Sequence, residues 1–128
     1  MKEITTTITN QTKGKLPRLP FSDIKDAVLG KTYELSIVFI GEKRSRRLNN
    51  TYRQKDKSTN VLSFSLEKNV GEIFITPVKA RREAKQFGRT VDNFIAFLLI
   101  HGLCHLKGME HGSTMERMEE KICKKFGI

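Results

Sequence analysis

The chain has 128 residues, of which 38% are apolar, and this size suits one compact domain rather than two. No apolar run approaches the ~18 residues that a membrane-spanning helix requires, and the first residues lack the apolar block of a signal peptide. Lysine and arginine number 24 against 14 acidic residues, a formal net charge of +10. We therefore predict one cytoplasmic domain over residues 1–128, without a membrane segment and attracted to polyanions such as nucleic acid.

The first part of the chain predicts two strands separated by a loop and a helix. β-Branched and polar residues alternate over residues 4–8, which is typical of a short strand. A loop with two prolines follows over residues 10–20. Ser22 is a candidate N-cap for a helix that ends at Gly30, and the apolar run over residues 33–40 indicates a buried strand.

The middle of the chain predicts a surface helix and a hairpin. Residues 42–53 are polar and basic, with Leu48 and Tyr52 as the apolar contacts of a helix that lies on the sheet. Apolar and polar residues alternate over residues 61–66, and a second apolar segment follows at residues 73–75. A short loop between these segments indicates a β-hairpin.

The last part of the chain predicts three helices. Residues 77–87 form a basic amphipathic pattern that Gly88 ends, and residues 94–106 are apolar nearly all round, which is typical of a central buried helix. Apolar residues recur at helical spacing from Met115 to Phe126. The order of elements predicts an α+β (mixed α/β) fold, a small mixed four-stranded sheet packed against several helices.

All 3 histidines of the chain lie between positions 101 and 111. Residues four apart on a helix lie ~40° round its axis and ~6 Å along it, so His101 and His105 can bind one cation from the central helix. Gly108 ends that helix and lets the chain return with His111 as a third ligand. We predict one Zn²⁺ per chain, with a fourth coordination position open as in catalytic sites. The alternative is that two of these are ordinary hydrogen-bonded core histidines.

The same histidine spacing occurs in metzincin proteases, which carry a glutamate directly after the first histidine as general base. This chain has Gly102 at that position, so protease chemistry lacks its proton acceptor. Glu110 is the nearest carboxylate that could replace it, and a supporting or solvated role for Glu110 is equally open.

Three segments together resemble the bacterial YbeY family. The first is His101-Gly-Leu-Cys-His-Leu-Lys-Gly-Met-Glu-His111, similar to that family's His-Gly-x-Leu-His-Leu-x-Gly-Tyr-Asp-His. The second runs from Leu48 to Phe64 and is similar to Leu-Asn-x-x-Tyr-Arg followed by Asp-x-x-Thr-Asp-Val-Leu-Ser-Phe. The third, residues 71–73, resembles Gly-Asp-Ile. The departures in the first segment are Glu110 for Asp, Cys104 for Leu and Met109 for Tyr, and none removes a histidine. In the second segment, Asn60 stands where the family often has Asp.

The resemblance implies a zinc-dependent endoribonuclease that acts on single-stranded RNA. It also implies a role in 16S ribosomal RNA 3′-end maturation and ribosome quality control, with the small ribosomal subunit and its assembly factors as partners. By position, His101, His105 and His111 become the zinc ligands and Arg53 the essential arginine, which can grip a phosphate. Asn49, Tyr52 and Asp56 are expected to fix the loop around Arg53.

Two alternatives remain open at this stage: an RNA-binding biogenesis factor whose zinc is mainly structural, and a zinc hydrolase of a non-RNA substrate. Basic side chains in residues 43–47 and 79–89 offer a phosphate-binding surface, whether the protein cleaves RNA or only binds it. The aromatic residues, 8 Phe and 2 Tyr, lie mostly within apolar runs. We therefore expect sequence-independent contact with the RNA backbone and no base-stacking platform.

Overall fold

A computed structural model describes residues 5–128 and contains one four-stranded mixed sheet with strand order β1-β2-β4-β3. Strands β1 (Thr6–Asn10), β2 (Glu34–Phe39) and β4 (Val70–Ile75) are parallel, and β3 (Val61–Glu67) pairs antiparallel with β4. This confirms the predicted α+β class and the hairpin. Ile4, which we placed in the first strand, lies outside the described residues.

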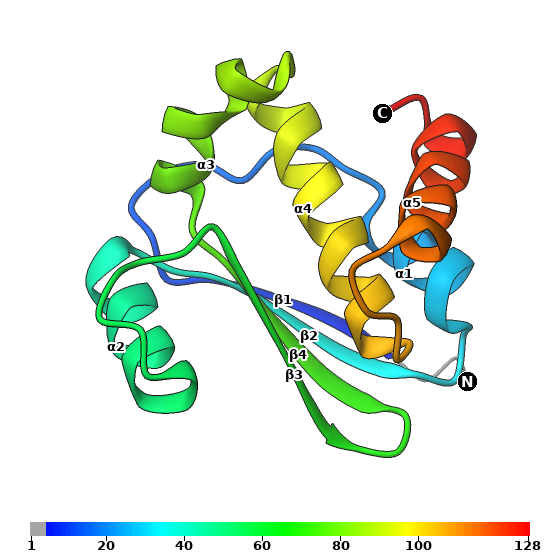
Figure 1. Ribbon diagram of the computed structural model, residues 1–128, viewed down its shortest axis with the longest axis horizontal. Helices are drawn as coiled ribbons and strands as arrows, with labels where there is room; N and C mark the ends of the chain where they lie inside the picture. Colours follow the sequence, from blue (N-terminus) through cyan, green and yellow to red (C-terminus); the bar gives the residue numbers. More distant parts are fainter. Residues whose placement is uncertain (1–4) are drawn as a thin grey trace.

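Side chains of β2 and β4 alternate between two cores. Ile37 and Ile73 face the main core, which α1 (Phe21–Leu29), α4 (Val91–Leu106) and α5 (Ser113–Phe126) complete. Val38 and Phe74 face a smaller core under α2 (Glu42–Arg53). Helix α2 therefore lies on the opposite face of the sheet from the other helices (Figure 1). The predicted position of α2 on the sheet is confirmed, although Tyr52 is 62% exposed and touches Phe64 edge-on.

Helix α1 and the segment that follows β4 differ from the prediction. Helix α1 begins at Phe21 with Pro20 at the N-cap, so Ser22 is inside the helix and does not cap it. The reason is tertiary: Phe21 is buried and packs edge-to-face on Phe39, which draws the first helical residue into the core. The segment from Pro77 to Phe87 is an α-helix, α3 (Pro77–Glu83), followed by a 3₁₀ helix, η1 (Ala84–Phe87), that ends at Gly88 with φ of 64°.

Helix α4 is the central element of the fold. It contacts β3, β4, α1, α3 and α5, and it begins at Val91, where the Thr90 hydroxyl accepts a hydrogen bond from the Asn93 backbone N–H. Its buried Gly102 allows close approach to the sheet, because a Cβ there would lie 3.1 Å from Ile73 Cδ1. None of the helices in residues 5–128 has the length and hydropathy that crossing a membrane requires.

One buried cation ties the sheet to α1. The Lys25 side chain is fully buried, and its Nζ donates to Thr5 Oγ1 at 3.0 Å, to the Gly30 carbonyl at 3.2 Å and to the Tyr33 carbonyl at 3.0 Å. The same Nζ lies 2.7 Å from Asp26 Oδ1. Lys25 thus supplies donors to carbonyl groups of the α1–β2 connection that would otherwise be unpaired.

We predict that Lys25→Ala lowers the free energy of unfolding by about 3 kcal/mol, because buried acceptors lose their donor and a cavity opens. Lys25→Met should also destabilise the protein, since it restores much of the volume without the donors. Urea denaturation checks both variants, with the exposed Lys31→Ala as control. A loss below about 0.5 kcal/mol, the usual range for surface substitutions, would contradict the prediction.

Candidate metal centre

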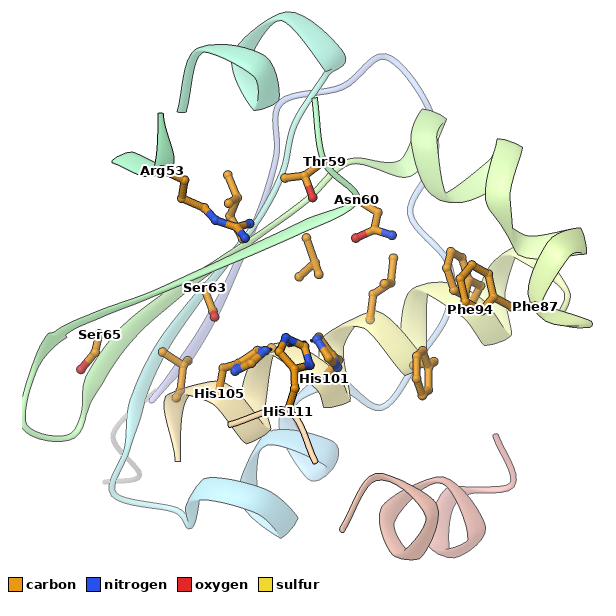
Figure 2. A pocket seen from close by; sticks show the side chains of 16 residues that line it. Arg53, Thr59, Asn60, Ser63, Ser65, Phe87, Phe94, His101, His105 and His111 are labelled. Atoms are coloured by element: carbon orange, nitrogen blue, oxygen red, sulfur yellow. Dashed lines mark hydrogen bonds between the residues drawn. The ribbon is translucent and has the colours of Figure 1, made fainter. Parts of the chain in front are cut away.

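The three histidines converge, as the sequence predicts. One ligand atom from each of His101, His105 and His111 lies within 4.8 Å of the others. His101 and His105 project from one face of α4, with ring centroids 4.7 Å apart. The His111 ring lies 5.2 Å from the His101 ring and 4.7 Å from the His105 ring. Figure 2 shows the three imidazoles gathered at one point of the cleft.

The return of His111 depends on the end of α4. Gly108 adopts a φ of 97°, a left-handed conformation that favours glycine, and its N–H bonds the His105 carbonyl at 2.9 Å. The Met109 N–H then bonds the Cys104 carbonyl at 3.0 Å. The chain is thereby folded back against the helix end, and His111 follows two residues later.

Hydrogen bonds to the outer ring nitrogens set the tautomers of two histidines. His101 Nδ1 lies 2.8 Å from Glu119 Oε2, and His105 Nδ1 lies 3.1 Å from the Met109 carbonyl oxygen. Both partners are acceptors, so each Nδ1 donates and each Nε2 keeps its lone pair for a ligand. Burial lowers the pKa of His105, and the neighbouring His101 lowers it further. A neutral ring is the form that binds metal.

The spacing of these nitrogens fits a metal ion. His101 Nε2 and His105 Nε2 are 3.2 Å apart. Two nitrogens bound to one tetrahedral zinc at ~2.0–2.1 Å lie about 3.3 Å from each other. Residues of this type and spacing can therefore hold one metal ion.

Glu119 is a site residue that our sequence reasoning missed. It comes from α5, is only 8% exposed, and shares the inward face of that helix with Met115 and Ile122. An acidic residue in an apolar helical stripe was the available signal. Glu110, the carboxylate that we proposed, is exposed and does not line the cleft around the histidines. Its role in catalysis stays a prediction.

The histidines line a cleft of about 630 Å³, which we call the metal cleft. Its lining includes Arg53 at one end and Phe87 and Phe94 at the other, with Asn60 between them (Figure 2), and it also includes Phe97. Figure 2 shows the Arg53 guanidinium pointing into the cleft from the side opposite the imidazoles. No ion pair within residues 5–128 involves Arg53, so its guanidinium is available to an anion.

Polar contacts from α2 fix the loop that follows Arg53. Asn49 is buried and its Nδ2 donates to the Lys57 carbonyl at 2.8 Å. Arg46 and Asp56 form a bidentate pair at 2.7 and 3.0 Å. Ser45 Oγ donates to the Thr59 carbonyl and accepts from the Thr59 N–H, both at 2.9 Å. Asn49, on α2, and Asp56, in the loop itself, thus hold this loop as we expected, whereas the exposed Tyr52 contacts Phe64 instead.

A family model described as Endoribonuclease YbeY matches residues 4–127. The chain belongs to the YbeY family. This confirms the resemblance and the enzyme class that the sequence predicts, a hydrolase of RNA. The chain is 37% identical to Endoribonuclease YbeY of Nautilia profundicola, over 84% of this chain and 81% of that protein. It is 30% identical to Endoribonuclease YbeY of Lacticaseibacillus casei, over 81% and 80% of the two chains.

A solved structure shares the fold. The solution structure of TM1509 from Thermotoga maritima superposes with a TM-score of 0.66 at 24% identity, covering 94% of this chain and 88% of that chain. At this level of identity the similarity supports the architecture of the YbeY-family chain and nothing further.

We predict that Glu119→Gln weakens zinc binding about tenfold and Glu119→Ala closer to 100-fold, because His101 loses the acceptor that orients its ring and raises its basicity. Competition with a chromophoric chelator measures the affinity. Glu120→Gln, an exposed neighbour on the same helix, is the matched control and should bind zinc like the wild type. Equal affinity of all three variants would show that Glu119 does not support the site.

Proposed function

We propose that this protein is a single-strand-specific endoribonuclease that depends on one zinc ion per chain, held by His101, His105 and His111. The observation that carries this proposal is the convergence of three imidazole nitrogens in an open cleft, opposite Arg53, which has no carboxylate partner among residues 5–128. Family membership supports RNA as the substrate. We propose further that residues 1–128 act as one domain in the cytoplasm.

We also propose that the RNA is ribosomal. The family resemblance favours maturation of the 3′ end of 16S ribosomal RNA and ribosome quality control, with the small ribosomal subunit and its assembly factors as partners. The net charge of +10 is consistent with a large RNA substrate.

The chain's own residues prepare the site for phosphodiester chemistry. When bound, zinc supplies Lewis acidity toward a phosphoryl oxygen. Glu119 and the Met109 carbonyl hold the imidazoles of His101 and His105, so no side-chain reorganisation is needed during the reaction. Three protein ligands, one of them the exposed His111, leave room for substrate, and this favours a catalytic over a purely structural zinc.

Arg53 is proposed to bind the scissile phosphate and to offset the charge that develops on it. Its planar fork of donors suits phosphate oxygens better than a lysine would. A second hollow adjoins the metal cleft, shares Arg53 with it, and adds Lys55, Lys57 and Lys79. We propose that this second hollow holds neighbouring phosphates of the strand and thereby aligns it across the histidines.

We predict that zinc-loaded wild type cleaves single-stranded RNA, that His105→Ala reduces cleavage to background, and that Arg53→Ala lowers kcat about 10²- to 10³-fold. A loss of this size in kcat is typical when one hydrogen-bond donor to the charge of the transition state is removed. Cleavage of an end-labelled ribosomal RNA fragment, resolved on a gel, measures all three. Chelation should abolish the activity and added zinc should restore it.

Arg117→Ala, an exposed arginine on α5 outside the metal cleft, is the matched control for the loss of a positive charge. Glu110→Gln in the same assay tests the proton-handling role of that carboxylate. Equal cleavage by wild type and His105→Ala would identify a contaminating nuclease. Inert wild type that still binds RNA with a steep salt dependence would replace the proposal with an RNA-binding factor.

A further inference from the structure

A row of aromatic rings leads from the protein surface to the metal centre. The Phe87 and Phe94 rings stack with centroids 4.9 Å apart and planes inclined by 20° (Figure 2). Phe94 and Phe97 follow at 6.3 Å and 12°, and the Phe97 ring lies 6.3 Å from the His101 ring. The aromatic end of the metal cleft is therefore continuous with the histidines.

Phe87 is the exposed member of this row. Its side chain is 56% exposed although Phe94, on which it stacks, is buried. The large apolar side chains that are exposed in residues 5–128 are Ile8, Tyr52, Leu66 and Phe87, and among them Phe87 alone lines the metal cleft. We expected no base-stacking platform, because the aromatic residues lie mostly within apolar runs. Phe87 is an exception, since it stands between Gln86 and Gly88 and ends the short η1 helix with its ring exposed.

We propose that the exposed ring of Phe87 is a stacking platform for one unpaired nucleobase of an RNA strand bound in the metal cleft. The proposal rests on the proposed function and adds a base-binding subsite to it. Phe94 holds the Phe87 ring in place by stacking on one side, so the exposed remainder is preorganised for a planar ligand. Every nucleobase offers a π-face, so such a site tolerates different sequences.

Charge complementarity favours a nucleotide over an apolar peptide at this site. The opposite end of the metal cleft carries Arg53, and the hollow beside it adds Lys55, Lys57 and Lys79, with Glu83 as the single acidic residue. An RNA strand can place its phosphates at the basic end and a base at the aromatic end, whereas an apolar peptide has no negative charge for the basic end. A base inside a duplex has both faces covered by its neighbours, so only an unpaired nucleotide can use the platform.

The chain contains no tryptophan, so Phe87→Trp introduces a single fluorescent reporter at the platform. We expect a short single-stranded oligodeoxynucleotide, which resists ribonuclease cleavage, to quench this indole by stacking. An abasic oligomer of equal length and charge should not quench it. Leu66→Trp, at a residue that is 54% exposed on β3 and outside the metal cleft, is the control and should respond to neither probe.

Affinity gives a second measurement on the same probes. Wild type should prefer the base-bearing oligomer over the abasic one by about 5- to 100-fold, and Phe87→Ala and Phe87→Leu should lose that preference. Circular dichroism confirms that the variants are folded. Equal quenching at positions 87 and 66, or a base preference that persists in Phe87→Ala, overturns the platform.

These outcomes separate the platform from the proposed function. If zinc-dependent RNA cleavage is observed while Phe87→Ala keeps the base preference, the platform is wrong and the nuclease stands. If RNA is not cleaved while the indole of Phe87→Trp is quenched only by base-bearing strands, the platform stands and the protein binds single strands without cutting them.

Discussion

The site depends on holding His101 Nε2 and His105 Nε2 3.2 Å apart, close to the separation of two nitrogens bound to one tetrahedral metal ion. The protein can impose this spacing because both rings are tied from behind, one to the Glu119 carboxylate and the other to the Met109 carbonyl. Helix α4 sets the separation, and these acceptors set the ring orientation. The rest of the structure holds α4 in a fixed position relative to the Glu119 carboxylate and the Met109 carbonyl.

This requirement explains why α4 is so apolar. A helix that contacts the sheet, α1, α3 and α5 must bury nearly all of its surface, and its histidines are tolerated only where they reach the cleft. Gly102 sits between the two histidines on the buried side, against Ile73. A side chain at that position, such as the glutamate of metzincins, would crowd Ile73, which would have to shift by a few tenths of an ångström.

The parts of the site that follow from local geometry were predictable from the sequence. The spacing of His101 and His105 is helical, and Gly108 marks where the chain turns back toward His111. Glu119 was not predicted, because its contact with His101 depends on how α5 packs against α4, and residue spacing within one helix does not determine that packing. The fold class was predictable because hydrophobic periodicity is a local property of the sequence. The start of α1 was not predictable in this way, because it depends on the burial of Phe21 in the core.

Cys104 illustrates how the same packing removes a competing ligand. It lies on α4 one residue before His105, and sequence spacing alone leaves it near the metal. In the fold its side chain is fully buried, and burial raises the pKa of its thiol to about 11, with the nearby Glu119 acting in the same direction. Cys104 is not among the residues whose ligand atoms converge, and the donor set is three imidazoles.

The two ends of the metal cleft set a geometric condition on any strand that binds there. Phosphates are attracted to the end that carries Arg53, and the aromatic end offers the exposed Phe87 ring. A strand that contacts both ends has to place an unpaired base on the Phe87 ring while its phosphates lie near Arg53. Paired nucleotides cannot do this without breaking base stacking, which costs a few kcal/mol. Preference for single strands would then follow from the shape of the cleft, without any residue that reads sequence.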